Sequence, residues 1–343
     1  MDKIEALAAT VAQLQALAAL TTAPTPLPVI NLAALAALGI TGLNADNLPV
    51  FLALVAASAD SGTGADSLAE LQALVTQAQQ DHAQILLAQQ RQQAAIQLIQ
   101  AYAGDSSTAA GSTAPTLADF ATAGVTGITV SNLSAIQSAL ATPAITGAQL
   151  GDTASVQNLV NAYSLILAEA NGSNADATPN ANPTASTYAA IGATTAAGMA
   201  DNGSAQSLLN NVIGQSSAAQ VDSVAEIEAL ALAVNAVMNT AANASPQATA
   251  ANFATLGITG VHADNLSVVL AALQATNDDG SGARTQAQLQ ALVDSVNAHL
   301  IGVISQYAQA NSGTAPTVAD YARAGISGVD SVNIFAVNSA LAS

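Results

Sequence analysis

The sequence predicts an all-α protein, a tandem array of short three-helix units that is elongated rather than globular. The first observation is a segment that recurs, in its fullest form Gly-Ile-Thr-Gly-Val-His-Ala-Asp-Asn-Leu at positions 257–266. Close copies begin at Gly39, Gly124 and Gly325, and a degenerate copy begins at Gly192, where Thr195 replaces the second glycine. The five leading glycines lie 85, 68, 65 and 68 positions apart, and a spacing of this kind is typical of repeat architectures.

The second observation is a short helix that should end at each leading glycine. Thr116 and Thr317 stand where an N-cap is needed, and Asp119 and Asp320 follow three residues later as in a capping box. The glycine then supplies the positive φ of a helix C-terminus. Four residues before it lies a large apolar side chain that we expect to fill the core of each unit, namely Leu35, Phe120, Tyr188, Phe253 and Tyr321.

A second helix should follow each turn. Its expected N-caps are Asp46, Ser131, Asp264 and either Asp330 or Ser331. Apolar residues spaced three and four apart, such as Leu48, Leu52 and Val55, would form its buried face.

The third helix has the clearest start signals, since a Ser or Thr precedes a Glu or Gln by three residues. These pairs are Ser67–Glu70, Ser223–Glu226 and Thr285–Gln288. In the first full unit, Glu70 to Tyr102 spans 32 positions, whereas Gln288 to Tyr307 spans 19. We therefore expect a longer, projecting third helix there.

These signals divide the chain into six segments. They are 1–38 (an N-terminal helix and the first short helix), 39–123 (repeat 1), 124–191 (repeat 2), 192–256 (degenerate repeat 3), 257–324 (repeat 4) and 325–343 (an incomplete repeat). The ends admit two interpretations. Either 1–38 and 325–343 are complementary parts of one unit, or the natural unit runs from the third helix to the second and both ends are ordinary boundaries.

Composition excludes several classes of protein. There are 22 acidic but only 4 basic residues, a net charge of −18, so we expect no nucleic-acid binding and no membrane insertion. Cysteine is absent, which excludes disulfides and thiol chemistry. An acidic chain rich in Ala, Ser, Thr and Asn favours an extracellular location, although the first residues do not resemble a secretion signal.

The order of short helix, glycine turn, second helix, loop and capped third helix resembles the Ala-rich helical repeats of large bacterial surface proteins and adhesins. The residues that carry the resemblance are 118–127 and 319–328, together with the Leu-Gln-Ala-Leu-Val segments within 70–75 and 288–293. More distantly, the pattern is similar to the GA module, an albumin-binding three-helix unit of surface proteins. GA modules are rich in lysine and this chain is not, so we do not expect albumin binding. The resemblance to adhesins implies an extracellular stalk or spacer and no particular receptor.

Chemistry is sparse in this sequence. None of the three histidines has a metal-site partner at the usual spacing, and no nucleophile elbow or phosphate loop is present, so we expect no enzyme and no cofactor. Acidic glycine-containing loops are candidate Ca²⁺ sites, because oxygen ligands around a turn suit that ion. The candidate ligands are Asp60, Asp66, Asn277, Asp278 and Asp279.

These observations favour a structural stalk or spacer at the cell surface. An alternative is a subunit that polymerises head to tail into an extracellular filament or surface layer. Its contact residues would be Ile4, Leu7, Val11 and Leu14 at one end and Val332, Phe335, Val337 and Leu341 at the other. A third possibility is a protein-binding module that uses the second helices or the long helix. The expected partners are thus the protein itself or adjoining repeats of a longer chain.

Overall fold

A computed structural model describes residues 2–19, 30–58, 64–104, 113–173, 182–199, 202–277, 279–310 and 313–343. All regular elements in these residues are helices, and the only extended pairing among them is an isolated bridge between Asn171 and Ser217. The all-α prediction is therefore confirmed.

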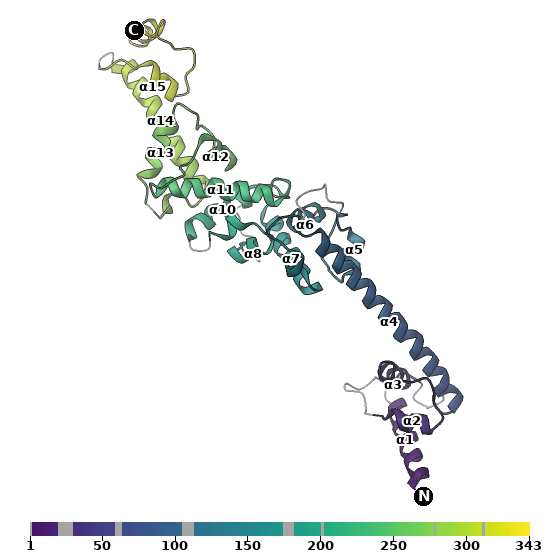
Figure 1. Cartoon of the computed structure of the whole chain (residues 1–343). Helices are drawn as coiled ribbons and strands as arrows, with labels where there is room; N and C mark the ends of the chain where they lie inside the picture. The colour runs from purple at the N-terminus through teal and green to yellow at the C-terminus, as the bar shows by residue number, and fades with distance from the viewer. Residues whose placement is uncertain are drawn as a thin grey trace. The chain divides into compact units, whose positions relative to one another are not determined.

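The helices are short, with three exceptions of 18 residues or more. In chain order they are α1 Asp2–Ala18, α2 Leu32–Ala37, α3 Leu48–Ala56, α4 Leu68–Tyr102, α5 Leu117–Thr122, α6 Leu133–Leu140, α7 Thr153–Glu169, α8 Ala185–Ala190, α9 Thr194–Ala197, α10 Gly203–Gln215, α11 Val224–Ala241, α12 Ala250–Thr255, α13 Leu266–Gln274, α14 Gln286–Ala310, α15 Val318–Arg323 and α16 Ile334–Leu341 (Figure 1). Three single turns of 3-10 helix lie at Gly147–Leu150, Ala218–Gln220 and Ser281–Ala283.

The chain forms two compact units, residues 1–94 and 95–343, and the division falls inside α4. In the first unit α1 packs against α2 and α3. Its core consists of aliphatic side chains around one phenylalanine, among them Leu14, Leu17, Leu35, Phe51 and Val75. The last turns of α4 belong to the core of the second unit, through Ala95 and Ile99.

Helix α11 is central to the second unit, where it packs against α9, α10, α12 and α13. By length and composition alone it could cross a bilayer, but 61% of it is buried within the unit. Eleven of its 18 residues are buried, among them Ile227, Val234 and Val237. Core packing therefore accounts for its apolar composition.

The sequence signals for helix starts are largely correct. Thr116 accepts a hydrogen bond from the backbone N–H of Asp119, and the Asp119 carboxylate accepts one from the backbone N–H of Thr116. The same reciprocal box stands at Thr317–Asp320 and at Ser223–Glu226. Each box satisfies two backbone donors that an α-helix leaves without partners at its N-terminus.

The expected N-caps of the second helices are wrong. The structure places an asparagine at the N-cap of each of these helices, namely Asn47, Asn132, Asn265 and Asn333. The first three lie one residue after the expected N-cap. Asn333 lies three residues after Asp330 and two after Ser331. None of these asparagines caps its own helix. The reason is that each is engaged with the preceding turn, as described below.

The expected core residues are buried in every copy. Leu35, Phe120, Tyr188 and Phe253 are fully buried, and Tyr321 is 2% exposed. The Tyr321 hydroxyl donates to Asn338 Oδ1 at 2.5 Å, and the Tyr188 hydroxyl donates to Asn210 Oδ1 at 2.6 Å. Tyrosine thus occupies this core position in the two copies where an asparagine on another helix accepts a hydrogen bond from its hydroxyl.

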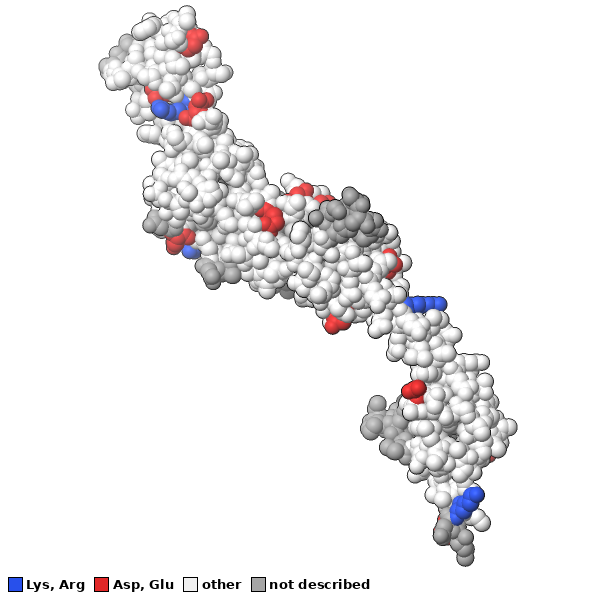
Figure 2. Space-filling model, in the orientation of Figure 1, with Lys and Arg blue, Asp and Glu red and all other residues white. Residues whose placement is uncertain are grey.

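Helix α4 has 35 residues and α14 has 25, so the expectation that the helix through Glu70–Tyr102 is longer than the one through Gln288–Tyr307 is confirmed. The middle of α4 carries three consecutive apolar residues, Ile85, Leu86 and Leu87, that are each more than a third exposed. Acidic and basic side chains are scattered thinly over the face drawn in Figure 2 and form no basic patch there.

Candidate functional site

The recurring glycine turn is the most regular polar arrangement in the described residues. Both of its glycines have positive φ, +91° at Gly39 and +89° at Gly42. The corresponding pairs Gly124–Gly127, Gly257–Gly260 and Gly325–Gly328 have φ between +72° and +83°. A residue with a β-carbon is strained in this region, which explains why glycine recurs at both places.

A glutamine from the following long helix holds the residue directly before the second glycine. Gln157 Oε1 accepts from the backbone N–H of Thr126 at 2.8 Å, and Gln157 Nε2 donates to the carbonyl of the same threonine at 3.0 Å. We call this pair of bonds the glutamine clamp. A primary amide is suited to it because one group carries both a donor and an acceptor.

The clamp recurs with the same separation along the chain. Gln72 makes both bonds to Thr41 at 3.1 and 2.9 Å, and Gln290 makes both to Thr259 at 2.9 and 3.1 Å. In all three cases the two residues are 31 positions apart. The clamp therefore fixes the third helix against the turn in the same register each time.

The degenerate copy has a related single bond, to the residue that replaces the second glycine rather than to the one before it, 33 positions apart instead of 31. Glu228 Oε1 accepts from the backbone N–H of Thr195 at 2.8 Å. An ionised carboxylate has no hydrogen to donate, so the second bond of the clamp cannot form there.

An asparagine completes each turn from the other side. Asn132 Oδ1 accepts from the backbone N–H of Thr129 at 2.7 Å, and its Nδ2 donates to the carbonyl of Gly127 at 2.9 Å. We call this pair of bonds the asparagine staple. It is repeated by Asn47, Asn265 and Asn333, with all bond lengths between 2.7 and 3.1 Å.

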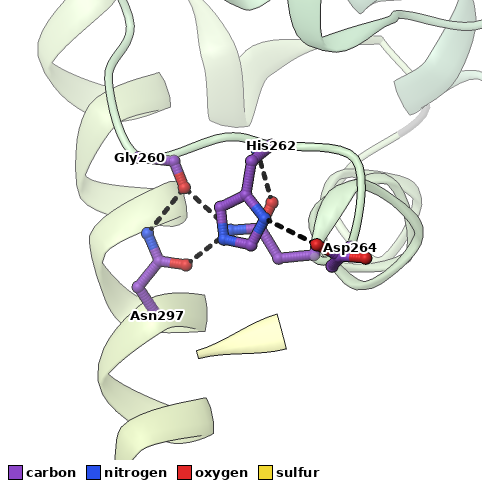
Figure 3. Close-up of polar contacts among 5 residues, drawn as sticks. Gly260, His262, Asp264 and Asn297 are labelled. Carbon is purple, nitrogen blue, oxygen red and sulfur yellow. Dashed lines mark hydrogen bonds and ion pairs between the residues drawn. The ribbon is translucent and has the colours of Figure 1, made fainter. Parts of the chain in front are cut away.

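Figure 3 shows the fullest version of the turn. Asn297 of α14 donates to the carbonyl of Gly260 at 3.0 Å, and its Oδ1 accepts from Asn265 at 2.9 Å. His262 lies on the turn with its Nδ1 3.9 Å from Asp264 Oδ2, and its backbone N–H donates to Asn265. In the first unit Gln79 makes the bond equivalent to that of Asn297, donating to Gly42 at 2.8 Å.

The calcium candidates are only partly within the described residues. Asp60 and Asp278 lie outside them. Asp66 interacts with Glu70 at the start of α4, and its backbone N–H donates to Glu70 Oε2 at 3.2 Å. Hydrogen bonding with the Glu70 side chain raises the pKa of Asp66 above its usual value. Asp279 accepts from the backbone N–H of Ser281 at 2.9 Å, and its bonds to Ser281 lower its pKa. Within the described parts of the chain no three acidic or histidine side chains are grouped as metal ligands are.

The self-association candidates differ in their exposure. Ile4 is 75% exposed and Val11 39%, whereas Leu14 is 2% exposed and lies in the core of the first unit. Leu7, Val337 and Leu341 are half-buried. Val332 and Phe335 are 87% and 82% exposed. Leu14 thus has no free apolar surface to offer a partner.

The hydrogen-bond partners of the clamp and the staple indicate a structural role for the turn. The clamp and the staple use amide side chains to satisfy backbone groups, and no buried side-chain nitrogen or oxygen in the described residues lacks a hydrogen bond. The polar groups at the turn therefore bond to the chain itself.

Comparisons with protein-family models, curated proteins and solved structures found no match.

Proposed function

We propose that this chain is a non-enzymatic structural repeat region of an extracellular bacterial surface protein, serving as a stalk or spacer. The observation that carries the proposal is the glutamine clamp. It joins three of the turns to a residue 31 positions later on a long helix by bonds to main-chain atoms, at Thr41, Thr126 and Thr259. A junction repeated in this way suits a scaffold that is extended by adding units.

In this proposal each unit consists of a short helix, a second helix after the glycine turn, and a clamped third helix. Single helices of six to nine residues, such as α5 and α13, are not stable alone in water. Their stability comes from neighbours, as in other linear repeat proteins, where each unit contacts only the next. A stalk needs this property because its length is then set by the number of units.

Small-angle X-ray scattering tests the elongated shape. A compact globule of 343 residues has a radius of gyration of about 20 Å. We expect a clearly larger value, independent of protein concentration. A value close to that of the globule contradicts the spacer proposal.

A second candidate function, assembly into a filament or surface layer, is favoured by two exposed residues at the C-terminal turn. Both positions hold other residue types in the copies that begin at Gly39, Gly124 and Gly257. The position of Val332 holds Asp46, Ser131 or Asp264, and the position of Phe335 holds Pro49, Ser134 or Ser267. All six of those residues are exposed, so the positions face solvent throughout. Large apolar side chains there indicate a contact that the other copies do not make.

Light scattering over rising protein concentration, with and without Ca²⁺, separates the two functions. Assembly that disappears in Phe335→Ser, and on deletion of residues 2–20, supports the filament. A monomer at all concentrations, with and without Ca²⁺, eliminates it and leaves the spacer standing.

A further inference from the structure

The C-terminal turn differs from the other turns in the burial of one residue. Ile40, Val125 and Ile258, which follow their leading glycines, are 2%, 5% and 4% exposed. Ile326 occupies the same place and is 41% exposed. The backbone conformation is the same, since Gly325 and Gly328 have φ of +76° and +81°. The difference therefore lies in what covers the turn.

The second helices show the same difference. Two apolar residues four positions apart are fully buried on α3 (Phe51, Val55), on α6 (Ile136, Leu140) and on α13 (Val269, Leu273). Their counterparts on α16 are Val337 and Leu341, and both are half-exposed. Ile326, Val337 and Leu341 together form what we call the open seat.

In the other copies a long helix lies at these positions. Helix α7 packs against α6 and α14 against α13, and Val75 of α4 lies in the same core cluster as Phe51 and Val55. The helices α4, α7 and α14 begin at a capping residue, Ser67, Asp152 or Thr285. Four and eight residues after the cap each helix buries an apolar side chain, in the pairs Leu71/Val75, Val156/Val160 and Leu289/Val293. Five residues after the cap stands the glutamine of the clamp.

At the C-terminal turn the residue that a clamp would hold is Ser327. Within the described residues no glutamine side chain bonds to its backbone, although the asparagine staple of the same turn is complete through Asn333. The turn is thus built for a clamp, with its main-chain donor and acceptor flanked by the open seat.

Helix α1 of a second copy fits this seat poorly. Its Leu14 and Leu17 are already in the core of the first unit, which leaves only its first three turns free. In those turns, the residue five positions after Asp2 is Leu7, which cannot make the clamp.

We infer that the open seat is a docking site for one kind of partner, an amphipathic helix of the α14 type. That helix has a capped Ser or Thr start, apolar residues four and eight positions later, and a glutamine at the fifth position. The inference rests on the proposed repeat scaffold and adds the chemistry by which the turn that begins at Gly325 is recognised. The glutamine would bond to the backbone N–H and carbonyl of Ser327.

A synthetic peptide of residues 285–310 tests this in trans with the full chain. We expect saturable one-to-one binding, measured by fluorescence anisotropy of a labelled peptide. Replacing the glutamine at position 290 of the peptide by alanine removes two hydrogen bonds and should weaken binding roughly tenfold. Replacing Leu289 and Val293 by aspartate should abolish it.

Variants of the full chain locate the site. Ile326→Asp and Val337→Asp should each lose peptide binding, while circular dichroism reports an unchanged fold because both residues are already partly exposed. Phe335→Asp is the matched control, since this residue is more exposed than either and lies outside the open seat. Loss of binding in Phe335→Asp alone would overturn the assignment.

A fusion in cis removes the dependence on peptide folding. Ser343 corresponds to Ala275, 68 positions earlier, so residues 276–310 appended after Ser343 place a clamp helix in register. Hydrogen exchange of the amides in 325–341 should then slow by tenfold or more. Unchanged exchange, or tighter binding by a peptide of residues 2–18 than by 285–310, overturns the inference. Neither result alters the scattering test of the spacer, so the two proposals fail separately.

Discussion

The side-chain amide of Gln157 bonds to both main-chain groups of Thr126, at 2.8 Å to its N–H and 3.0 Å to its carbonyl. The threonine hydroxyl adds a third contact to Gln157 Oε1 at 3.2 Å. Because one amide makes both bonds to one residue, a shift of the helix along its axis would weaken both of them.

Removing the clamp should loosen one junction. In Gln290→Ala we expect unfolding to become easier by about 1–2 kcal/mol, since each net hydrogen bond is worth about 1 kcal/mol. Urea unfolding gives the free energy, and hydrogen exchange at Thr259 gives the location. Gln306→Ala, an exposed position of the same helix, is the control for helix propensity and should change little. Equal effects of the two variants contradict the clamp.

Exchanging the staple amide for an acid should make the turn sensitive to pH. In Asn132→Asp the ionised carboxylate cannot donate to the Gly127 carbonyl, so we expect a loss of about 1–2 kcal/mol near pH 7. Below a pH of about 4 the protonated acid has both a donor and an acceptor, and much of the loss should be regained. Urea midpoints measured from pH 7 to pH 3 follow the change. A deficit that stays constant over this range contradicts the staple.

The two glycine positions separate backbone strain from steric conflict. A β-carbon on Gly127 meets nothing within 4 Å, so Gly127→Ala should cost only the strain of positive φ, about 1–2 kcal/mol. On Gly260 the same carbon lies 2.7 Å from Asn297 Nδ2, so Gly260→Ala should cost more. Gly127→Asn should be milder than Gly127→Ala, because asparagine tolerates this conformation. Thermal unfolding of the three variants ranks them.

The capping box at Thr116–Asp119 should weaken in acid. Hydrogen bonds from Thr116 hold the pKa of Asp119 below its usual value. A carboxyl whose folded pKa is lowered stabilises the fold above its unfolded pKa of about 3.9, and this contribution is lost as pH falls through the folded value. The stability difference between the native chain and Asp119→Asn should therefore shrink between about pH 5 and pH 2.

The start of α12 is an internal control for that experiment. At Thr249 the equivalent box uses Asn252, whose Oδ1 accepts from the Thr249 backbone N–H at 2.9 Å. An amide does not titrate, so exchange protection at the start of α12 should not follow the pH dependence of α5. If both helix starts respond alike, the Asp119 carboxylate is not the cause.

Much of the fold could be predicted from sequence because its signals are local. Capping pairs such as Ser223–Glu226, and glycines that need positive φ, depend on residues three or four apart. The core residue four positions before each glycine was also predictable, since its size recurs. The choice between tyrosine and phenylalanine there was not, because it depends on Asn338 or Asn210 on another helix.

The turn itself was the harder part. The Asn of the Asn-Leu pair recurs in the sequence and looks like a neighbour of an N-cap, but its bonds run backwards to Gly127 and Thr129. The clamp glutamine also recurs, five residues after the cap, as in Gln72. Its 31-residue reach depends on how the helices pack, and composition and periodicity do not specify that.

The clamp recognises main-chain atoms that every amino acid except proline possesses. Thr126 could become serine, valine or alanine and still offer the same N–H and carbonyl to Gln157, so the junction places almost no demand on the identity of the residue that it grips. Glu228 likewise bonds to a main-chain group, the N–H of Thr195, with a carboxylate oxygen in place of the amide oxygen. In the proposed repeat scaffold, a unit of different sequence would therefore still offer the same main-chain atoms to the clamp of its neighbour.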